Sequence, residues 1–406
     1  MSRRRHRWIA PVIVLVVILA AGGYVALALA RTPPAATAAV SAPGLPKPAA
    51  YVYTAPHAGE SAVSVTGSAF PAANGMLGAG GGTAAVPMAS ISKLITAMVI
   101  LEKKPLAATD AGPTITFSKA DSDLYDKYYV LNASVSSMKT GSAMTESDAL
   151  KVMLIASACN YAEAVSTWAF GSQANFLAAT TSWLAANSLA DTRMVEPTGV
   201  DSHNVSTPAN LVAIGRLALA NPLVAAIVTQ SQAQVANVGE IQNTNELLGT
   251  DGVDGIKTGT LDSGSDLLFS STTKIAGTAP LSVVGVILGG SSRETVDADA
   301  RQILASIRLG FHETQVISKD QVMGKYTTPW GDSAKVVAAS TGTLLVWSDT
   351  AITSTVLTKH IAAATDGTTV GSITYTAGSQ KVTVPLVLSG SITAPDWLWR
   401  VTHPGG

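Results

Sequence analysis

The chain has 406 residues and a formal net charge of −1, with 26 basic and 27 acidic side chains, so its charge does not indicate a nucleic-acid partner. Hydrophobic residues make up 47% of the sequence, which is sufficient for a folded core and argues against disorder. The single cysteine, Cys159, excludes an intrachain disulfide framework and a zinc cluster built from cysteines.

The sequence begins with a targeting segment. Four arginines within the first seven residues precede the uncharged stretch Trp8–Ala30, and Arg31 follows it. This stretch is long enough to span a bilayer, and the positive-inside rule places the arginines in the cytoplasm and the rest of the chain outside. The small-x-small sequence Ala28-Leu29-Ala30 leaves a cleavable signal peptide as the alternative. In both interpretations the protein is exported. Residues 1–31 are therefore expected to be a single-pass membrane anchor or a secretion signal.

The segment that follows, residues 32–55, is rich in proline and alanine and predicts an extended linker. Glu60–Phe70 alternates weakly between apolar and polar residues and is expected to be a strand. The glycine-rich Gly75–Gly82 lacks the lysine and flanking pattern of a phosphate-binding loop, so no nucleotide is expected there.

Apolar residues then recur at three- and four-residue spacing, which indicates helices. The helices expected on this basis are one that opens at Ser90 with Ile91, Leu94, Ile95, Met98 and Leu101 on one face, and others over Glu146–Phe170, Asn175–Ser188, Pro208–Leu219 and Thr295–Leu309. Strands are expected over Gly252–Thr260, Leu267–Lys274 and Leu281–Gly289.

The C-terminal part has the pattern of a β protein. Val370–Tyr375 and Lys381–Leu388 flank Ala377-Gly378-Ser379, as the strands of a hairpin flank a turn. The sequence therefore predicts an α+β domain over residues 56–315, followed by a small all-β domain over residues 316–406.

Ser90-Ile91-Ser92-Lys93 is the first candidate for chemistry. Three residues apart on a helix, Ser90 and Lys93 lie on one face with their Cβ atoms about 5–6 Å apart. A serine hydroxyl needs a base to become a nucleophile, and a lysine in a suitable environment can be that base. The backbone N–H groups at a helix start favour a developing oxyanion.

The same Ser-x-x-Lys spacing occurs at Ser136/Lys139 and at Ser271/Lys274, so the pattern alone is weak. The first of these lies in a polar stretch without a helical apolar face, and the second lies in an expected strand, where the two side chains point to opposite faces. Only Ser90 opens an amphipathic helix.

Lys257-Thr258-Gly259-Thr260 is the second candidate. On a strand at the edge of a site, Lys257 and the Thr258 hydroxyl can hold a substrate carboxylate, and a glycine lets another chain approach closely. The backbone N–H of Thr260 could complete an oxyanion hole with that of Ser90. A second Lys-Thr-Gly, at Lys139-Thr140-Gly141, lacks a strand pattern and is interpreted as a loop.

Together these segments resemble the serine D-alanyl-D-alanine carboxypeptidase and endopeptidase family, the low-molecular-mass penicillin-binding proteins. The resemblance extends from about Ser61 to Phe311. It is carried by the segments Pro87–Ala97, Met153–Ser157, Val195–Val200, Ser206-Thr207, Asn243–Leu248 and Gly252–Gly259.

The resemblance implies a penicillin-binding/β-lactamase-like transpeptidase domain, with an antiparallel sheet flanked by helices and a helical insert. It implies that Ser90 is acylated by peptidoglycan stem peptides ending in D-Ala-D-Ala and by β-lactam antibiotics. Lys93 would be the proton acceptor, Ser157 a proton relay, and Lys257 and Thr258 the carboxylate anchors. No metal or cofactor is expected, and His57, His203, His312 and His360 share no metal-binding spacing.

The second motif departs from the family. Its pattern is Ser-x-Asn, but Ser157-Ala158-Cys159 carries cysteine at the third position, with Asn160 one residue later. A thiol is only a weak hydrogen-bond donor and cannot copy an amide, which both donates and accepts. Either Asn160 reaches the site through a local shift, or the site works less well. An intact Ser202-His203-Asn204 in a later loop is the alternative.

Three functions are therefore compared. A D-Ala-D-Ala peptidase is favoured, and its carboxypeptidase and endopeptidase forms share the same motifs. A β-lactamase uses similar motifs, but the segment Val195–Val200 and the β-rich tail fit the peptidase better. A non-catalytic muropeptide- or penicillin-binding scaffold is the third possibility, because the motif asparagine is missing.

Overall fold

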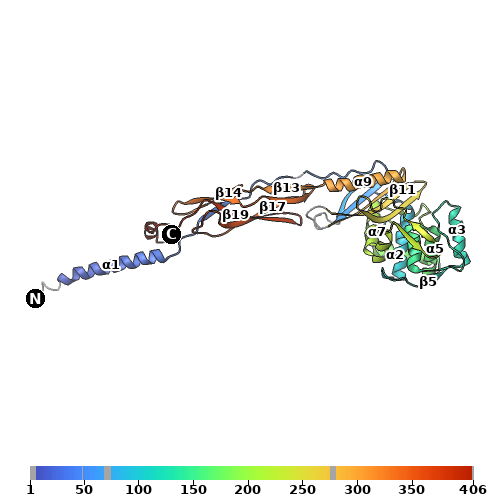
Figure 1. The fold of residues 1–406 in the computed structure, drawn as a ribbon, viewed down its shortest axis with the longest axis horizontal. Coiled ribbons are helices and arrows are strands. Elements are labelled where there is room, and N and C mark those ends of the chain that lie inside the picture. Colours follow the sequence, from blue (N-terminus) through green and yellow to red (C-terminus); the bar gives the residue numbers. More distant parts are fainter. Residues whose placement is uncertain (1–5, 48, 68–74, 275–279, 405–406) are drawn as a thin grey trace. The chain divides into compact units, whose positions relative to one another are not determined.

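A computed structural model of the chain describes residues 6–47, 49–67, 75–274 and 280–404. It divides into two compact units (Figure 1), of which one is Ala50–Phe311 and the other combines Met1–Ala49 with His312–Gly406. The second unit differs from the expected domain division, in which residues 32–55 were a linker separate from the C-terminal domain.

The first unit is built around an antiparallel five-stranded sheet in the order β10-β11-β12-β2-β3. Its strands are β2 (Glu60–Thr66), β3 (Met76–Gly80), β10 (Val253–Leu261), β11 (Gly264–Thr273) and β12 (Leu281–Gly290). β11 and β12 are buried along most of their length. β12 is apolar over most of its length, as a strand covered on both faces requires, whereas only Leu267–Phe269 is apolar in β11. Helices α7 and α9 contact this sheet and lie on opposite sides of it in Figure 1.

The helices of this unit follow the apolar periodicity of the sequence. They are α2 (Ser92–Lys103), α3 (Lys119–Tyr129), α4 (Glu146–Ile155), α5 (Cys159–Phe170), α6 (Gln173–Ala186), α7 (Pro208–Ala220), α8 (Pro222–Val228) and α9 (Arg293–Leu309). The helix expected over Glu146–Phe170 is interrupted, because Ser157 adopts a left-handed backbone with φ 59° between α4 and α5. This break separates Ser157 from the regular helix and presents it at the surface of a cleft.

Short two-stranded sheets complete the first unit. They pair β4 (Val86–Pro87) with β7 (Val205–Ser206), β5 (Thr114–Thr116) with β6 (Ala143–Thr145), and β8 (Gln232–Val235) with β9 (Gly239–Gln242). The β4–β7 pairing brings the start of the Ser90 segment beside the loop that follows Val195.

The second unit is mainly β structure. A six-stranded sheet has the order β1-β14-β15-β19-β18-β17, and β13 pairs with β16. The strands are β1 (Thr37–Val40), β13 (Phe311–Ile317), β14 (Val322–Thr327), β15 (Ser333–Ala338), β16 (Gly342–Trp347), β17 (Ile352–Thr358), β18 (Thr369–Ala377) and β19 (Gln380–Ser389). The hairpin expected around Ala377-Gly378-Ser379 is formed by β18 and β19.

Part of the expected linker is a strand of this sheet. β1 pairs antiparallel with β14, and Gly324 of β14 is needed for the close approach, because a Cβ atom there would lie 2.0 Å from the carbonyl oxygen of Ala39. Ala36, just before β1, is buried in the core of the unit. The linker prediction was wrong here. β1 and β14 are far apart in the sequence, and their pairing leaves no local pattern in the proline- and alanine-rich segment that contains β1.

The N-terminal helix α1 (His6–Ala30) contains the apolar stretch Ala10–Ala30, with a mean hydropathy of 2.8. Within the described residues it is the one straight helix long and apolar enough to cross a membrane; α7 and α8 pass the same test only as a pair bent by 103°. The short helix α10 (Trp397–Thr402) packs beside α1, and Tyr24 Oη donates a 2.7 Å hydrogen bond to the carbonyl of Val401. A helix of this kind at the N-terminus fits either a membrane anchor or a signal sequence.

Candidate active site

Ser90 lies in a tight turn that leads into a helix. Ala89–Ile91 forms a 3₁₀ turn that continues directly into α2, and Ala89 has a left-handed φ of 44°. The Ser92 hydroxyl donates a 2.8 Å hydrogen bond back to the Ala89 carbonyl and so closes the turn. Ser90 is half-buried and faces a cleft, whereas its neighbours Ala89 and Ile91 are fully buried.

Lys93 is fully buried one helical turn after Ser90, and its amine has three polar neighbours. Its Nζ lies 2.9 Å from Ser90 Oγ, 2.7 Å from the Thr198 carbonyl oxygen and 3.3 Å from Cys159 Sγ. The carbonyl can only accept a hydrogen, so it takes one N–H of the amine. The sulfur and the Ser90 hydroxyl both lie within hydrogen-bond distance of the same amine. The predicted Ser90–Lys93 pair is therefore formed with hydrogen-bond geometry.

The second motif comes to the same place through the break between α4 and α5. Ser157 and Cys159 both line the cleft, and both are nearly fully buried. Cys159, at the first residue of α5, contacts Lys93 where an asparagine would occupy the family motif. The thiol thus takes the place of the amide beside the lysine.

Asn160 does not reach the cleft, and its prediction as a substrate-binding residue is corrected. Its Oδ1 accepts a 3.1 Å hydrogen bond from the backbone N–H of Ser136, and its Nδ2 donates a 2.8 Å bond to the Ser136 carbonyl. One residue further along a helix points about 100° away, so Asn160 faces the preceding loop instead of Lys93. Both ends of its amide thus bind the backbone of that loop.

The Lys257-Thr258-Gly259-Thr260 segment lies on β10, as predicted, and β10 packs against the turn that carries Ser90. Gly259 is required for this approach, because a Cβ atom there would lie 2.8 Å from the Cβ of Ala89. Thr258 and Thr260 line the cleft. The Thr258 hydroxyl is 2.6 Å from that of Thr244.

Lys257 is buried beside the cleft, and its Nζ donates a 3.1 Å hydrogen bond to the Thr258 carbonyl. Burial lowers the pKa of Lys257 well below its usual value, and the positive charges of Lys93 and Arg293 act in the same direction. An arriving carboxylate would oppose this effect, because an opposite charge stabilises the protonated amine.

Arg293 is a further residue of the cleft that no sequence motif predicted. It is the first residue of α9 and lines the cleft at the outer part of β10. One guanidinium nitrogen donates a 2.7 Å hydrogen bond to the Thr244 carbonyl, and the other donates a 3.2 Å bond to Thr260 Oγ1. A pattern in the sequence could not reveal this, because Arg293 and Thr260 are brought together by the strands between them.

A loop built on Glu196 holds the Thr198 carbonyl in place. The Glu196 carboxylate accepts hydrogen bonds of 2.6 Å from the N–H of Thr198 and 2.5 Å from that of Gly199, and one of 2.9 Å from Asn204 Nδ2. Gly199, with φ 84°, lies so close to the Ala89 carbonyl that a Cβ atom would be 1.8 Å from its oxygen. The loop is therefore locked against the Ser90 turn.

These elements enclose a cleft of about 430 Å³. It is lined, among others, by Ser90, Ser157, Cys159, Thr244, Thr258, Thr260 and Arg293. The alternative motifs are not among its lining residues: Asn204 is buried in the Glu196 loop, the backbone of Ser136 bonds Asn160, and Ser271 contacts Thr273 within β11. Among the described residues, no group of three or more His, Cys, Asp or Glu side chains is placed to hold a metal ion.

The fold and the buried Ser–Lys pair are those of a serine peptidase. The family profile described as D-alanyl-D-alanine carboxypeptidase matches residues 71–291, more than half of the sequence. The chain belongs to this family, and its activity is that of a serine-type D-alanyl-D-alanine carboxypeptidase or endopeptidase.

Individual relatives agree with this assignment. A D-alanyl-D-alanine endopeptidase of Pseudomonas aeruginosa is 28% identical over 234 residues, which cover 55% of this chain and 70% of the relative. Penicillin binding protein 5 from Haemophilus influenzae has a similar fold, with a TM-score of 0.58 at 17% identity over 84% of this chain and 99% of its own. Penicillin binding protein 6B from Escherichia coli gives a TM-score of 0.57 at 19% identity over 86% and 100%. The predicted α+β transpeptidase fold with a β-rich second domain is thus confirmed.

Proposed function

We propose that the protein is an exported peptidase that cleaves peptidoglycan stem peptides ending in D-Ala-D-Ala through an acyl-enzyme on Ser90. The observation that carries this proposal is the position of the Lys93 amine, within hydrogen-bond distance of Ser90 Oγ and also held by Thr198. Such a buried amine can accept the hydroxyl proton without first being displaced.

In the acylation step, Ser90 Oγ attacks the carbonyl carbon of the penultimate D-Ala while its proton passes to Lys93 Nζ. The carbonyl oxygen becomes an oxyanion, which the backbone N–H groups of Ser90 and Thr260 are proposed to stabilise. The C–N bond then breaks, and the proton held by Lys93 passes to the leaving amine, for which Ser157 is the proposed relay. Water then attacks the ester carbonyl: its hydroxyl joins the acyl carbon, the bond from that carbon to Ser90 Oγ breaks, and the proton released by the water goes to Ser90 Oγ as the shortened peptide leaves.

The terminal carboxylate of the substrate is proposed to bind at the outer part of β10. Thr258 and Thr260 offer hydroxyls there, and Arg293 adds a permanent positive charge with a planar pair of donors. Lys257 lies deeper, and a bound carboxylate would counteract the lowering of its pKa, because an opposite charge favours the protonated amine.

The location outside the cytoplasm is part of the proposal. An apolar helix over Ala10–Ala30, preceded by arginines, would carry the catalytic unit across the membrane and either remain as a single-pass anchor or be removed as a signal. β-Lactams would act as covalent inhibitors at Ser90, because they present a strained amide carbonyl and a carboxylate to the same groups.

The release of D-alanine tests this function. The purified chain is incubated with a stem pentapeptide ending in D-Ala-D-Ala and, separately, with a cross-linked peptide dimer. Free D-alanine identifies a carboxypeptidase, and cleavage of the dimer identifies an endopeptidase. Rapid hydrolysis of penicillin with neither peptide cleaved would indicate a β-lactamase, and stable penicillin labelling without any turnover would indicate a binding scaffold.

A further inference from the structure

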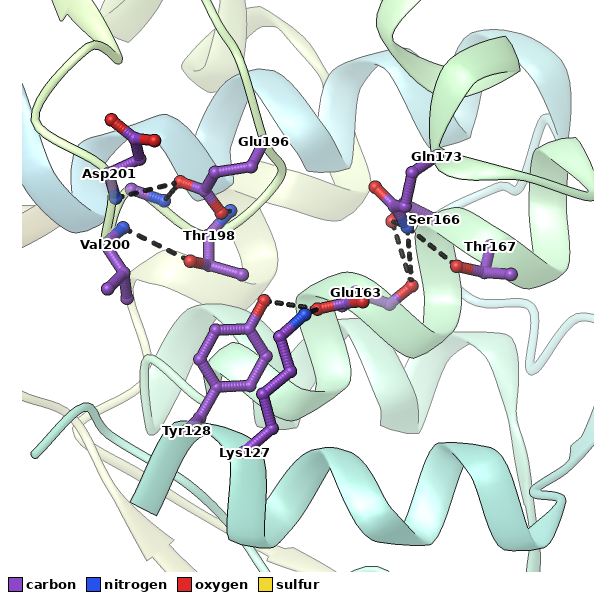
Figure 2. A network of polar contacts seen from close by, with 11 residues as sticks. Lys127, Tyr128, Glu163, Ser166, Thr167, Gln173, Glu196, Thr198, Val200 and Asp201 are labelled. Atoms are coloured by element: carbon purple, nitrogen blue, oxygen red, sulfur yellow. Dashed lines mark hydrogen bonds and ion pairs between the residues drawn. The ribbon is translucent and has the colours of Figure 1, made fainter. Parts of the chain in front are cut away.

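Helix α3 is held against α5 through one of its faces. Lys127 Nζ lies 2.6 Å from Glu163 Oε2, and Tyr128 Oη donates a hydrogen bond to the same oxygen, as Figure 2 shows. A capping box formed by Ser118 and Asp121 closes the start of the helix. The residues on the other face of α3 are therefore presented by an element that is fixed at its start and along its inner side.

The other face of α3 carries two stacked tyrosines. Tyr125 and Tyr129 lie one helical turn apart, with their ring centroids 6.0 Å apart and their ring planes 11° from parallel. Tyr129 is 64% exposed, and Tyr125 is half-buried. Because stacking covers only one face of each ring, both tyrosines keep a second aromatic face for another contact.

Tyr125 also lines a cavity of about 330 Å³ on the catalytic unit. One wall of this cavity is α3, and the other is formed by residues 135–138, which include the apolar side chains of Val135 and Met138. The two walls are joined by the Ser122 hydroxyl, which donates a 2.9 Å hydrogen bond to the Met138 carbonyl. The cavity is therefore built from two connected segments, with an aromatic ring and an apolar patch in its lining.

Three polar side chains of this lining are free to bind a ligand. The Asp126 carboxylate, the Ser137 hydroxyl and Tyr125 Oη make no hydrogen bond or ion pair with the described residues. Asp123 differs from them, because its carboxylate lies 2.5 Å from Lys119 Nζ. A carboxylate accepts hydrogen bonds, whereas hydroxyls both donate and accept, so this set suits a ligand that carries several hydroxyl groups.

A sugar ring combines the chemical groups that this lining would bind. Its C–H groups can stack on the electron-rich face of an aromatic ring, and its hydroxyls can donate to a carboxylate. The methyl group of an N-acetyl sugar would contact Val135 and Met138. The unpaired carboxylate of Asp126 disfavours a negatively charged ligand. The lining therefore favours a neutral sugar over an anionic polymer.

One short segment connects this cavity with the catalytic cleft. Ala133 lines the cleft, and Ser137, four residues later, lines the cavity. The segment is held in place by α5, because Asn160 binds both backbone groups of Ser136. Four residues span at most about 14 Å, and the four residues of a stem pentapeptide that precede the scissile bond cover a similar length. One glycopeptide is therefore long enough to contact both sites.

We propose that the cavity lined by Tyr125 and Asp126 is a subsite for a sugar of the glycan strand to which the cleaved peptide is attached. The sugar ring would stack on Tyr125, and its hydroxyls would bind the Asp126 carboxylate and the Ser137 hydroxyl. This inference rests on the proposed function, since it extends the substrate of that same site from a peptide to a glycopeptide.

Two substrates that differ only in the sugar test the proposal. They are the free stem pentapeptide and the same pentapeptide linked to the disaccharide unit of peptidoglycan; if only cross-linked peptides are cleaved, the dimer with and without this disaccharide replaces them. We expect kcat/KM for cleavage to be about tenfold higher with the disaccharide, through a lower KM. In Tyr125→Leu and in Asp126→Ala this ratio falls toward one.

Two control variants accompany this comparison. Tyr125→Phe retains the aromatic ring and should keep most of the wild-type ratio, which separates stacking on a sugar from a general loss of packing. Asp191→Ala removes another exposed carboxylate, one outside the lining of the cavity, and should keep the ratio unchanged.

The outcomes separate this inference from the proposed function. Equal kcat/KM for both substrates in the wild type, or a wild-type ratio in both Tyr125→Leu and Asp126→Ala, overturns the subsite, while cleavage of the free peptide upholds the peptidase. Absence of both peptide cleavage and penicillin acylation overturns the proposed function, and the subsite with it. Asp126 is exposed on α3, so its variant remains informative if Tyr125→Leu does not fold.

Discussion

Lys93 Nζ lies 3.3 Å from Cys159 Sγ, at the position where the family's second motif carries an asparagine. The structure thus answers which of two neighbouring residues occupies this place: the cysteine faces the catalytic lysine, and Asn160 binds the Ser136 backbone. The consequence is a weaker and less directional partner for the amine, because sulfur is a poor hydrogen-bond acceptor.

Replacing this thiol by an amide should therefore improve the site. In Cys159→Asn, the amide oxygen can accept from Lys93 while the NH₂ group donates to a substrate carbonyl. We expect the rate of penicillin acylation to rise about tenfold, equivalent to roughly 1.4 kcal/mol of activation free energy. Stopped-flow acylation kinetics measure it, with Cys159→Ala as the control that removes the thiol without supplying an amide. An unchanged or reduced rate in Cys159→Asn would show that the thiol is adapted to this site.

Glu196 is expected to act as a positioning residue through the Thr198 carbonyl. In Glu196→Gln an NH₂ group replaces an acceptor that faces N–H donors, so the loop should shift and Lys93 should lose its 2.7 Å partner. We predict a 10- to 100-fold slower acylation and an altered pH profile of the acylation rate. The exposed Glu240→Gln serves as the control. A lower melting temperature with a normal rate and pH profile would reduce Glu196 to a structural role.

Arg293 is expected to determine the affinity for the substrate carboxylate. Arg293→Leu should raise KM for the pentapeptide at least tenfold, with a smaller effect on kcat, because the cation binds a carboxylate whose charge does not change in the reaction. Arg293→Lys should restore only part of this, since lysine lacks the planar pair of donors that contacts Thr244 and Thr260. Arg301→Leu, on the same helix, is the control. An unchanged KM in Arg293→Leu would remove Arg293 from the carboxylate site.

The raised pKa of Asp266 should make the free energy of unfolding depend on pH in a specific direction. Burial raises the pKa of Asp266 to about 7, although the Gly289 N–H bond acts against this rise. The unfolded chain, with a pKa near 3.8, releases the proton first as the pH rises, so the folded state holds more protons between about pH 4 and pH 7. The Asp266 contribution to the free energy of unfolding therefore falls with rising pH across this window and is constant above it.

The substitution Asp266→Asn tests this sign. The amide oxygen can still accept from Gly289, so the variant should gain stability relative to the wild type as the pH rises, by roughly 1–4 kcal/mol at pH 8. Urea unfolding at pH 4.5, 6 and 8 measures the difference. A difference that does not grow with pH would contradict the raised pKa.

The parts of the site that the sequence predicted are those whose residues lie close together in the chain, on one helix or one strand. Ser90 and Lys93 lie three residues apart on one helix, and Lys257 to Thr260 lie on one strand, so a short pattern determines both arrangements. The place of Asn160 depends on where α5 begins, and a shift of one residue rotates the side chain out of the site. Arg293 and strand β1 depend on contacts between distant segments, which leave no local pattern.

The most direct test of the account is the identity of the residue that penicillin acylates. The full chain is incubated with a fluorescent penicillin and digested, and the labelled peptide is sequenced by mass spectrometry; Ser90→Ala and Lys93→Ala are treated in parallel. We predict one label, on Ser90, in the wild type, no label in Ser90→Ala, and acylation slower by orders of magnitude in Lys93→Ala. Ser90→Ala should remain folded, because loss of one hydroxyl at a helix start costs only about 0.5–2 kcal/mol. A label on Ser157, Ser136 or Ser271, or a Lys93→Ala rate within a few-fold of the wild type, would contradict it.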